Sequence, residues 1–333
     1  MTGRMDHTDR LSALAEGVKA DRPPVSLWRH FYKDEDNLDK FVEMMVGWQT
    51  QYDWDFMKIN PRASYQYEPW GVIMRPSPDR DTKAERVGFP VLRPIDCLKI
   101  TPIPTSHPQF DFQLKAVSRI RKDIKRPFRI TMTVFSPLSI LGDMVGSESV
   151  LLTSMRVHPE MLHAALRAVT DTFARLVHEF RNAGADGIFF ATTQWASANR
   201  LTVEELHRFA LPYDREVWDA AGTDAFNILH VCDSKIYLSE YKGFKAKLTN
   251  WDVALPGNPS MEEGYALLRS PVLGGIRHET DLVKDNPEQI TDKVRRLIDT
   301  NDEFPYSVGP GCAIPVTTPD DNVAAVRAAV DRN

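Results

Sequence analysis

Cysteine is scarce in this chain: only Cys97, Cys232 and Cys312 occur among its 333 residues. A low and odd number of cysteines argues against a framework of disulfides. Each cysteine is therefore expected to be a buried apolar side chain, a metal ligand or a nucleophile. For any one of them taken alone, a place in the core is the simplest interpretation.

Long apolar runs are also missing, and none approaches the roughly 20 residues that a membrane helix needs. The first residues, MTGRMDHTDRLSALAEG, are polar and lack the apolar stretch of a secretory signal. Lysines and arginines are dispersed, and the net charge is -5, so no basic stripe indicates a nucleic-acid partner. We therefore expect a cytoplasmic protein that binds neither membranes nor nucleic acids.

Nucleotide-binding patterns are absent too, since no G-x-G-x-x-G follows the early apolar runs and no P-loop pattern occurs. What the chain does contain is a series of short apolar runs, rich in β-branched residues, that indicate buried strands. The predicted strands are Asp55–Ile59, Phe128–Phe135, Gly187–Ala191, Asn227–Val231, Leu248–Val253, Val272–Ile276 and Tyr306–Val308.

Longer amphipathic stretches separate these runs, and their apolar residues recur at the three-and-four spacing of a helix face. The clearest predicted helices are Asn37–Tyr52, Pro159–Ala183, Val203–Ala221 and Pro287–Thr300. The third of these has a capping box, with Thr202 as the cap and Glu205 three residues later.

Alternating strands and helices predict an α/β fold with a parallel sheet buried on both faces. About eight such units fit a single (β/α)8 TIM-like barrel, and a doubly wound open sheet is the rival. We expect residues 1–22 to be an N-terminal lead-in and residues 23–333 to form the barrel. Residues 60–127 are rich in proline and are interpreted as an insertion after the first strand, with a short hairpin.

Two predicted strands are followed by side chains that suit a metal ion. His230 and Cys232 are two residues apart on an extended segment, so both point to the same side. Cys312 follows the last predicted strand in a turn rich in glycine and proline. Side chains at the carboxyl ends of barrel strands meet at the mouth. Two thiolates and one imidazole suit zinc, and three protein ligands with an open position are typical of a catalytic site.

Other side chains near predicted strand ends are weaker candidates. We predict catalytic roles for Asp252 and His278, of which Asp252 either orients a ligand, fills the fourth zinc position or only caps the next helix. Residues predicted to contact substrate are Arg29, His30, Lys58, Asn60, Tyr67, Gln194 and Glu279. Surface ion pairs and core packing are the alternative interpretations for this second group.

The chain resembles the uroporphyrinogen decarboxylase superfamily, and within it the zinc-dependent methyltransferase branch that includes methylcobamide:coenzyme M methyltransferases. The resemblance spans roughly residues 25–330. It is carried by Pro24-Val-Ser-Leu-Trp, Gly184-Ala-Asp-Gly, Ile228-Leu-His230-Val-Cys232, Asn250-Trp-Asp252, Leu273-Gly-Gly-Ile, Asn286-Pro-Glu-Gln-Ile and Gly309-Pro-Gly-Cys312-Ala-Ile-Pro-Val-Thr-Thr-Pro. In that branch the H-x-C pattern and the later Gly-Cys supply the zinc ligands, which match His230, Cys232 and Cys312.

The true decarboxylases of this superfamily differ from the chain at three places. Their arginine-rich N-terminal segment corresponds to Leu27–Tyr32 here, and their Gly-His-Gly turn is replaced by Gly309–Cys312. Their aspartate after the first strand falls near Lys58–Asn60. The residues that handle a four-ring acidic substrate are therefore missing, which argues against uroporphyrinogen decarboxylation.

The resemblance implies a zinc-dependent methyltransferase that works with a corrinoid, either free methylcobalamin or a separate corrinoid protein. The small methyl acceptor or donor would be a thiol, tetrahydrofolate or a methoxy or methylamine compound. A decarboxylase of a uroporphyrinogen-like or other carboxylated substrate and an inactive corrinoid-binding barrel are the rival interpretations. The oligomeric state stays open between a monomer and a homodimer.

Overall fold

The computed structural model describes residues 5–78, 82–301 and 303–331, and its centre is a parallel sheet. In this part of the chain the sheet has seven strands, hydrogen-bonded to one another in chain order. They are β1 (Phe56–Ile59), β4 (Arg129–Phe135), β5 (Gly187–Ala191), β6 (Ile228–His230), β7 (Leu248–Asn250), β8 (Val272–Ile276) and β9 (Tyr306–Pro310). All seven predicted strands are thus present, although some are one to three residues shorter or longer than expected.

A short extended segment at Pro24–Ser26 occupies the eighth position of the barrel. Its Val25 forms a parallel bridge with Val308 of β9. On its other side, the backbone N–H of Asp55, just before β1, donates to the Val25 carbonyl at 2.9 Å. The two edges of the sheet are therefore joined, and the predicted TIM-like fold is confirmed.

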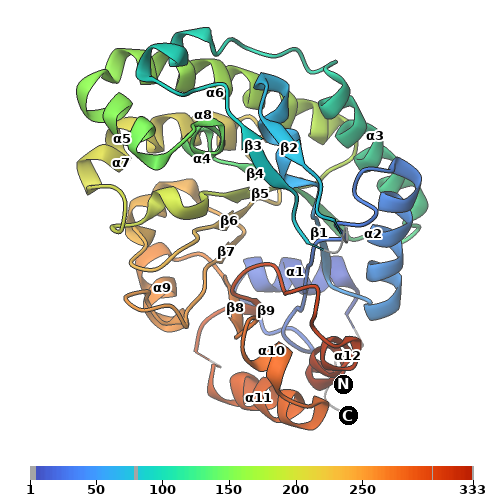
Figure 1. The fold of residues 1–333 in the computed structure, drawn as a ribbon. Helices are drawn as coiled ribbons and strands as arrows, with labels where there is room; N and C mark the ends of the chain where they lie inside the picture. Colours follow the sequence, from blue (N-terminus) through green and yellow to red (C-terminus); the bar gives the residue numbers. More distant parts are fainter. Residues whose placement is uncertain (1–4, 79–81, 302, 332–333) are drawn as a thin grey trace.

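Helices surround the strands, as Figure 1 shows. They are α1 (His7–Ala15), α2 (Leu38–Tyr52), α3 (Pro108–Asp123), α4 (Pro137–Met144), α5 (Glu148–Val157), α6 (Pro159–Asn182), α7 (Val203–Phe209), α8 (Leu211–Asp219), α9 (Met261–Leu268), α10 (Asp281–Lys284), α11 (Pro287–Thr300) and α12 (Asp320–Val330). None of these described helices combines the length and the apolar character that a membrane span requires.

One predicted helix is divided in two. The expected helix Val203–Ala221 is present as α7 and α8, which meet at Ala210. Pro212 lies in the first turn of α8, where its missing N–H is tolerated, but the same residue would interrupt a continuous helix. The predicted capping box of Thr202 and Glu205 is present at the start of α7.

Residues 60–127 contain an antiparallel pair of strands, β2 (Ile73–Arg75) and β3 (Glu85–Gly88), so the expected hairpin is present. Short 3-10 helices also lie here: η1 (Ala63–Gln66), η2 (Glu68–Trp70) and η3 (Pro94–Lys99). The stretch ends in α3, which is the regular helix between β1 and β4. The interpretation of the whole stretch as an insertion stays a prediction.

A compact apolar cluster fills the inside of the barrel. Most strands contribute to it, and Leu11 and Leu14 of α1 pack against it from the end of the barrel opposite the mouth. Its buried members are Leu11, Leu14, Trp28, Phe56, Phe189, Ala191, Phe226, Ile228, Leu248 and Leu273. The N-terminal lead-in thus contains the helix α1, which closes the end of the barrel that lies opposite the mouth.

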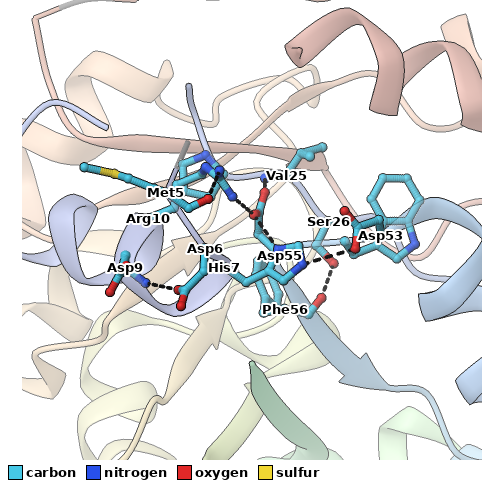
Figure 2. A network of polar contacts seen from close by, with 12 residues as sticks. Met5, Asp6, His7, Asp9, Arg10, Val25, Ser26, Asp53, Asp55 and Phe56 are labelled. Carbon is cyan, nitrogen blue, oxygen red and sulfur yellow. Dashed lines mark hydrogen bonds and ion pairs between the residues drawn. The ribbon is translucent and has the colours of Figure 1, made fainter. Parts of the chain in front are cut away.

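Asp55 fixes α1 to the barrel through a buried polar network (Figure 2). Its fully buried carboxylate accepts hydrogen bonds from Arg10 and Arg22, each at 2.6 Å, and from the backbone N–H of Val25 at 2.7 Å. His7 lies between this carboxylate and that of Asp53, at 3.0 and 3.1 Å. Burial alone would raise the pKa of Asp55, but His7 and the two guanidinium groups outweigh it and lower that pKa.

Candidate metal centre at the barrel mouth

His230, Cys232 and Cys312 converge at the carboxyl ends of two strands. His230 is the last residue of β6, Cys232 lies two residues beyond it, and Cys312 lies two residues beyond β9. One ligand atom from each residue lies within 4.8 Å of the other two. The His230 Nε2 atom and the Cys312 Sγ atom are 3.7 Å apart. The structure thus brings the three predicted ligands to one point, as their spacing and strand-end positions indicated.

Glycine allows the Cys312 turn to lie close to its neighbours. A Cβ atom at Gly311 would come within 2.7 Å of the Asp252 side chain, and one at Gly309 within 2.5 Å of Leu273. Such distances are well below van der Waals contact, so a larger residue would push the turn away from β7 and β8. The two glycines therefore allow the turn to bring the Cys312 thiol close to the His230 ring.

Asn250 sets the tautomer of His230. Its side-chain Nδ2 donates to the carbonyl oxygens of Leu273 and Pro310, at 2.8 and 2.9 Å. Its Oδ1 is therefore the atom that faces His230 Nδ1, at 2.6 Å, and it must accept the proton of that nitrogen. The Nε2 lone pair is then free toward the two thiols, which is the orientation that a metal-binding histidine needs.

The two thiols differ in acidity. The pKa of Cys312 lies well below that of an ordinary thiol, chiefly because the Cys232 thiol donates a hydrogen bond to it; the nearby His230 imidazole also lowers it. The pKa of Cys232 is correspondingly raised, since it keeps the shared proton beside the Cys312 thiolate. Cys312 is therefore the more readily ionised of the two thiols, and a thiolate is a soft ligand of the kind that zinc accepts.

A cavity of about 140 Å³ opens beside the three ligands. Its lining includes all three of them together with His30, Lys58 and Asn60, which were predicted to contact substrate. The remaining lining residues are mostly apolar or small: Trp28, Pro61, Ala63, Gln66, Thr133, Phe135, Phe189, Ala191, Thr193 and Ala313. The cavity thus has a sulfur and imidazole end, apolar walls and a few polar groups.

Lys58 is a buried amine in this cavity. It is 6% exposed, and its Nζ atom lies 4.6 Å from the centre of the Phe189 ring and 5.8 Å from that of Trp28. It donates a hydrogen bond to Asn60 Oδ1. Burial lowers the pKa of Lys58 to about 7, although the negative charge of Cys312 opposes the shift.

Two buried groups at the mouth, Glu35 and Gln66, were missed by the sequence reasoning. Glu35 lies near His30, with 4.0 Å between its Oε2 and His30 Nδ1. Burial raises the pKa of Glu35 to about 8 and lowers that of His30 to about 3. Neither Glu35 nor Gln66 directly follows a predicted strand, so the strand-end rule could not find them.

Asp252 and His278 lie beside the ligands but outside the cavity lining. The Asp252 Oδ2 and His278 Nδ1 atoms are 3.8 Å apart, and His278 is one of the groups that lower the pKa of Cys312. Asp252 Oδ1 also accepts the backbone N–H of Ala254 at 2.9 Å in a local turn, whereas the next helix, α9, is capped by Ser260 and not by Asp252. Their catalytic roles stay predictions.

Four other predicted substrate contacts have no counterpart in this cavity. Arg29 forms an ion pair with Asp320 at 3.2 Å, and Glu279 has a side chain that is 77% exposed. Tyr67 is buried, and the guanidinium group of Arg86 in β3 lies 6.0 Å from the centre of its ring. Gln194 lies in η4 (Thr193–Ala196) and is half-buried, but the cavity lining does not include it.

The fold and the site together define a β/α barrel with a candidate metal centre at its mouth. The chain belongs to the uroporphyrinogen decarboxylase (URO-D) family, whose pattern it matches over residues 6–333. This match confirms the family resemblance that the motifs indicated. A comparison with curated proteins finds no match.

Solved structures share the fold. A methyltransferase from Methanosarcina mazei superposes with a TM-score of 0.83 at 17% identity, covering 98% of each chain. A B12-independent methionine synthase from Shewanella sp. W3-18-1, in complex with selenomethionine, has a TM-score of 0.57 at 14% identity and covers 92% of this chain and 91% of its own. A putative vitamin-B12-independent methionine synthase from Listeria monocytogenes has a TM-score of 0.56 at 11% identity, covering 92% and 94%. At these identities the likeness establishes the shared architecture.

Proposed function

We propose that the protein is a zinc-dependent methyltransferase that moves a methyl group between a corrinoid and a small compound bound in the cavity. The observation that carries this proposal is the convergence of His230, Cys232 and Cys312 beside that cavity. The methyltransferase from Methanosarcina mazei, with the same fold over nearly the whole chain, supports it. Membership of the URO-D family supports an enzymatic role.

The donor set fits zinc. Two cysteine sulfurs and one imidazole nitrogen are ligands that zinc prefers, and a fourth position stays open to a substrate atom. Zinc bound there would act as a Lewis acid that keeps a thiol substrate ionised at neutral pH. The chain's own part is to hold the ligands: Asn250 fixes the His230 ring, and the glycine turn fixes Cys312.

The size of the cavity indicates that the two reactants bind in different places. At about 140 Å³ it is comparable to an engineered cavity of about 150 Å³ that holds benzene, so it accommodates a compound of about six non-hydrogen atoms. A corrin ring is far larger and must stay at the mouth. We therefore infer that free methylcobalamin or a separate corrinoid protein presents its cobalt to the mouth, while the small reactant binds inside.

Decarboxylation, the reaction that gives the family its name, suits this cavity less well. Its lining, drawn from the described residues, includes one lysine and no arginine. A substrate with many carboxylates would need several cationic partners, and it would exceed the cavity volume.

Methyl transfer from methylcobalamin to a panel of small thiols tests the proposal, with the absorbance of the corrinoid as the readout. Zinc-loaded protein is expected to demethylate the corrinoid, and removal of the metal is expected to reduce the rate at least about a hundredfold. Cys97→Ala is the matched cysteine control, because Cys97 is buried in the core and should leave the rate unchanged. Equal rates with and without zinc would contradict the proposal. Zinc binding without turnover on thiol, methoxy or methylamine compounds would favour the inactive corrinoid-binding barrel.

A further inference from the structure

The cavity has a polar end formed by Lys58, Asn60 and Gln66. Lys58 and Asn60 lie at the carboxyl end of β1, and Gln66 ends the 3-10 helix η1 that follows it. All three line the same cavity as the metal ligands, and all three are at least nine-tenths buried. Elsewhere the cavity walls are largely apolar, so these three side chains determine which polar groups it can accept.

The amide groups of Asn60 and Gln66 have donors without partners. Asn60 Oδ1 accepts a hydrogen bond from Lys58, and Gln66 Oε1 accepts one from the backbone N–H of Phe135 at 2.5 Å. Because both oxygens are engaged by donors, the opposite atoms are the NH₂ groups. Within the described residues, Asn60 Nδ2 and Gln66 Nε2 are buried without a hydrogen-bond partner. Buried donors of this kind favour a ligand that brings acceptor oxygens.

When Lys58 is protonated, the charge of this end is positive and has no carboxylate partner among the described residues. In the described part of the chain, Lys58 Nζ contacts Asn60 Oδ1 and the rings of Phe189 and Trp28, and none of these groups is a carboxylate. Because the pKa of Lys58 is about 7, a carboxylate bound beside the amine would hold it protonated. A buried cation is stabilised by an anionic partner, whereas a second cation in the same cavity is repelled.

We propose that Lys58, Asn60 and Gln66 form a head-group subsite that selects a small carboxylate and rejects ammonium compounds of the same size. The carboxylate oxygens would accept from the Lys58 amine and the two amide NH₂ groups. The other end of the compound would then face the sulfur and imidazole ligands. This inference deepens the proposed function, and it excludes methylamines as the compound that enters the cavity.

Ligand binding to the full-length, metal-free protein tests the subsite without any metal. Butyrate, butyramide and butylammonium are compared by saturation-transfer NMR, and their dissociation constants are obtained by titration. Butyrate is expected to bind at least about tenfold more tightly than butyramide, since a hydrogen bond to a charged group is about twice as strong as a neutral one. Butylammonium is expected to show no saturable binding.

Variants of Lys58 assign the preference to its charge. Lys58→Met is expected to weaken butyrate binding at least about tenfold and to leave butyramide within about twofold. Lys58→Gln keeps a donor for Asn60 Oδ1 and serves if the methionine variant folds poorly; it should lose the preference in the same way. Lys115→Met, on the exposed face of α3, is the matched control and should bind like the native protein.

A second arm uses the cobalt(II)-loaded protein and follows its visible absorption. The ligands are 3-mercaptopropionate, 3-mercaptopropanamide and 2-aminoethanethiol. If thiols bind the cobalt without a preference for the carboxylate, the subsite is overturned while the metal centre stands. If the metal-free protein prefers butyrate but no metal binds, the subsite stands and the proposed function fails. Equal binding of butyrate and butyramide by the native protein, or an unchanged preference in Lys58→Met, would overturn the inference.

Discussion

Replacing Cys312 with serine is expected to reduce zinc affinity at least about a hundredfold. The structure gives this thiol a lowered pKa and places it 3.7 Å from the His230 nitrogen, so it is the ligand best prepared for a metal. Zinc binding to sites with four protein ligands is worth about 10–16 kcal/mol in all, and loss of one thiolate of three ligands removes several kcal/mol of it. Competition with a chromophoric chelator measures the change in affinity.

Cys97→Ser is the matched control for this substitution. Cys97 is also buried, but it lies in η3 among core residues and far from the three ligands in the chain. We expect one zinc per chain and native affinity for this variant. The account would be contradicted by native zinc affinity in Cys312→Ser, or by an equal loss of zinc in both variants.

Replacing Asp55 with asparagine is expected to lower the free energy of unfolding by about 3–5 kcal/mol. The substitution keeps the volume of the side chain but removes the charge that two buried guanidinium groups share. Breaking a buried ion pair on one side leaves the partner charge uncompensated, which is the reason for the large effect. For a chain of this length, the loss corresponds to a decrease in Tm of about 4–7 °C. Thermal unfolding followed by circular dichroism measures it.

The pH dependence of this difference follows from the lowered pKa of Asp55. Because the folded-state pKa lies below the unfolded value of about 3.9, the carboxylate stabilises the fold fully above that value. The advantage of the native protein over Asp55→Asn should therefore be constant near neutral pH and shrink as the pH falls below about 4. Asp39→Asn is the control, since this residue is 82% exposed in its ion pair with Arg119 and should change stability by less than about 1 kcal/mol. A native-like Tm for Asp55→Asn would show that the network does not hold α1 in place.

Much of the fold could be predicted because each strand is a short apolar run between amphipathic stretches. The segment Pro24–Ser26 could not, because three residues that begin with proline give no periodicity, and only the tertiary bridge to Val308 makes them part of the barrel. The division of α7 from α8 rests on Pro212, which the sequence shows. The apolar spacing continues on both sides of this proline, and that continuity favours a single helix in a prediction from the sequence.

The part of the candidate site that lies at strand ends could be predicted from the sequence. The candidate residues lie at or just beyond the carboxyl ends of parallel strands, and the topology brings such positions together: His230, Cys232, Cys312, Lys58 and Asn60. The directions of side chains in loops do not follow from that rule. Arg29 turns outward to its ion pair, and Gln66 turns inward from a 3-10 helix for which the sequence gives no such signal.

The central claim is that two thiolates and one imidazole bind a single zinc ion with an open position. X-ray absorption spectroscopy at the zinc edge, on protein loaded with one equivalent of zinc, tests it most directly. The account predicts two sulfur neighbours at about 2.3 Å and one histidine nitrogen at about 2.0 Å, with a light atom in the fourth position. Addition of 3-mercaptopropionate should replace that light atom with a third sulfur. A first shell without sulfur, or a shell that stays unchanged when the thiol is added, would contradict the account.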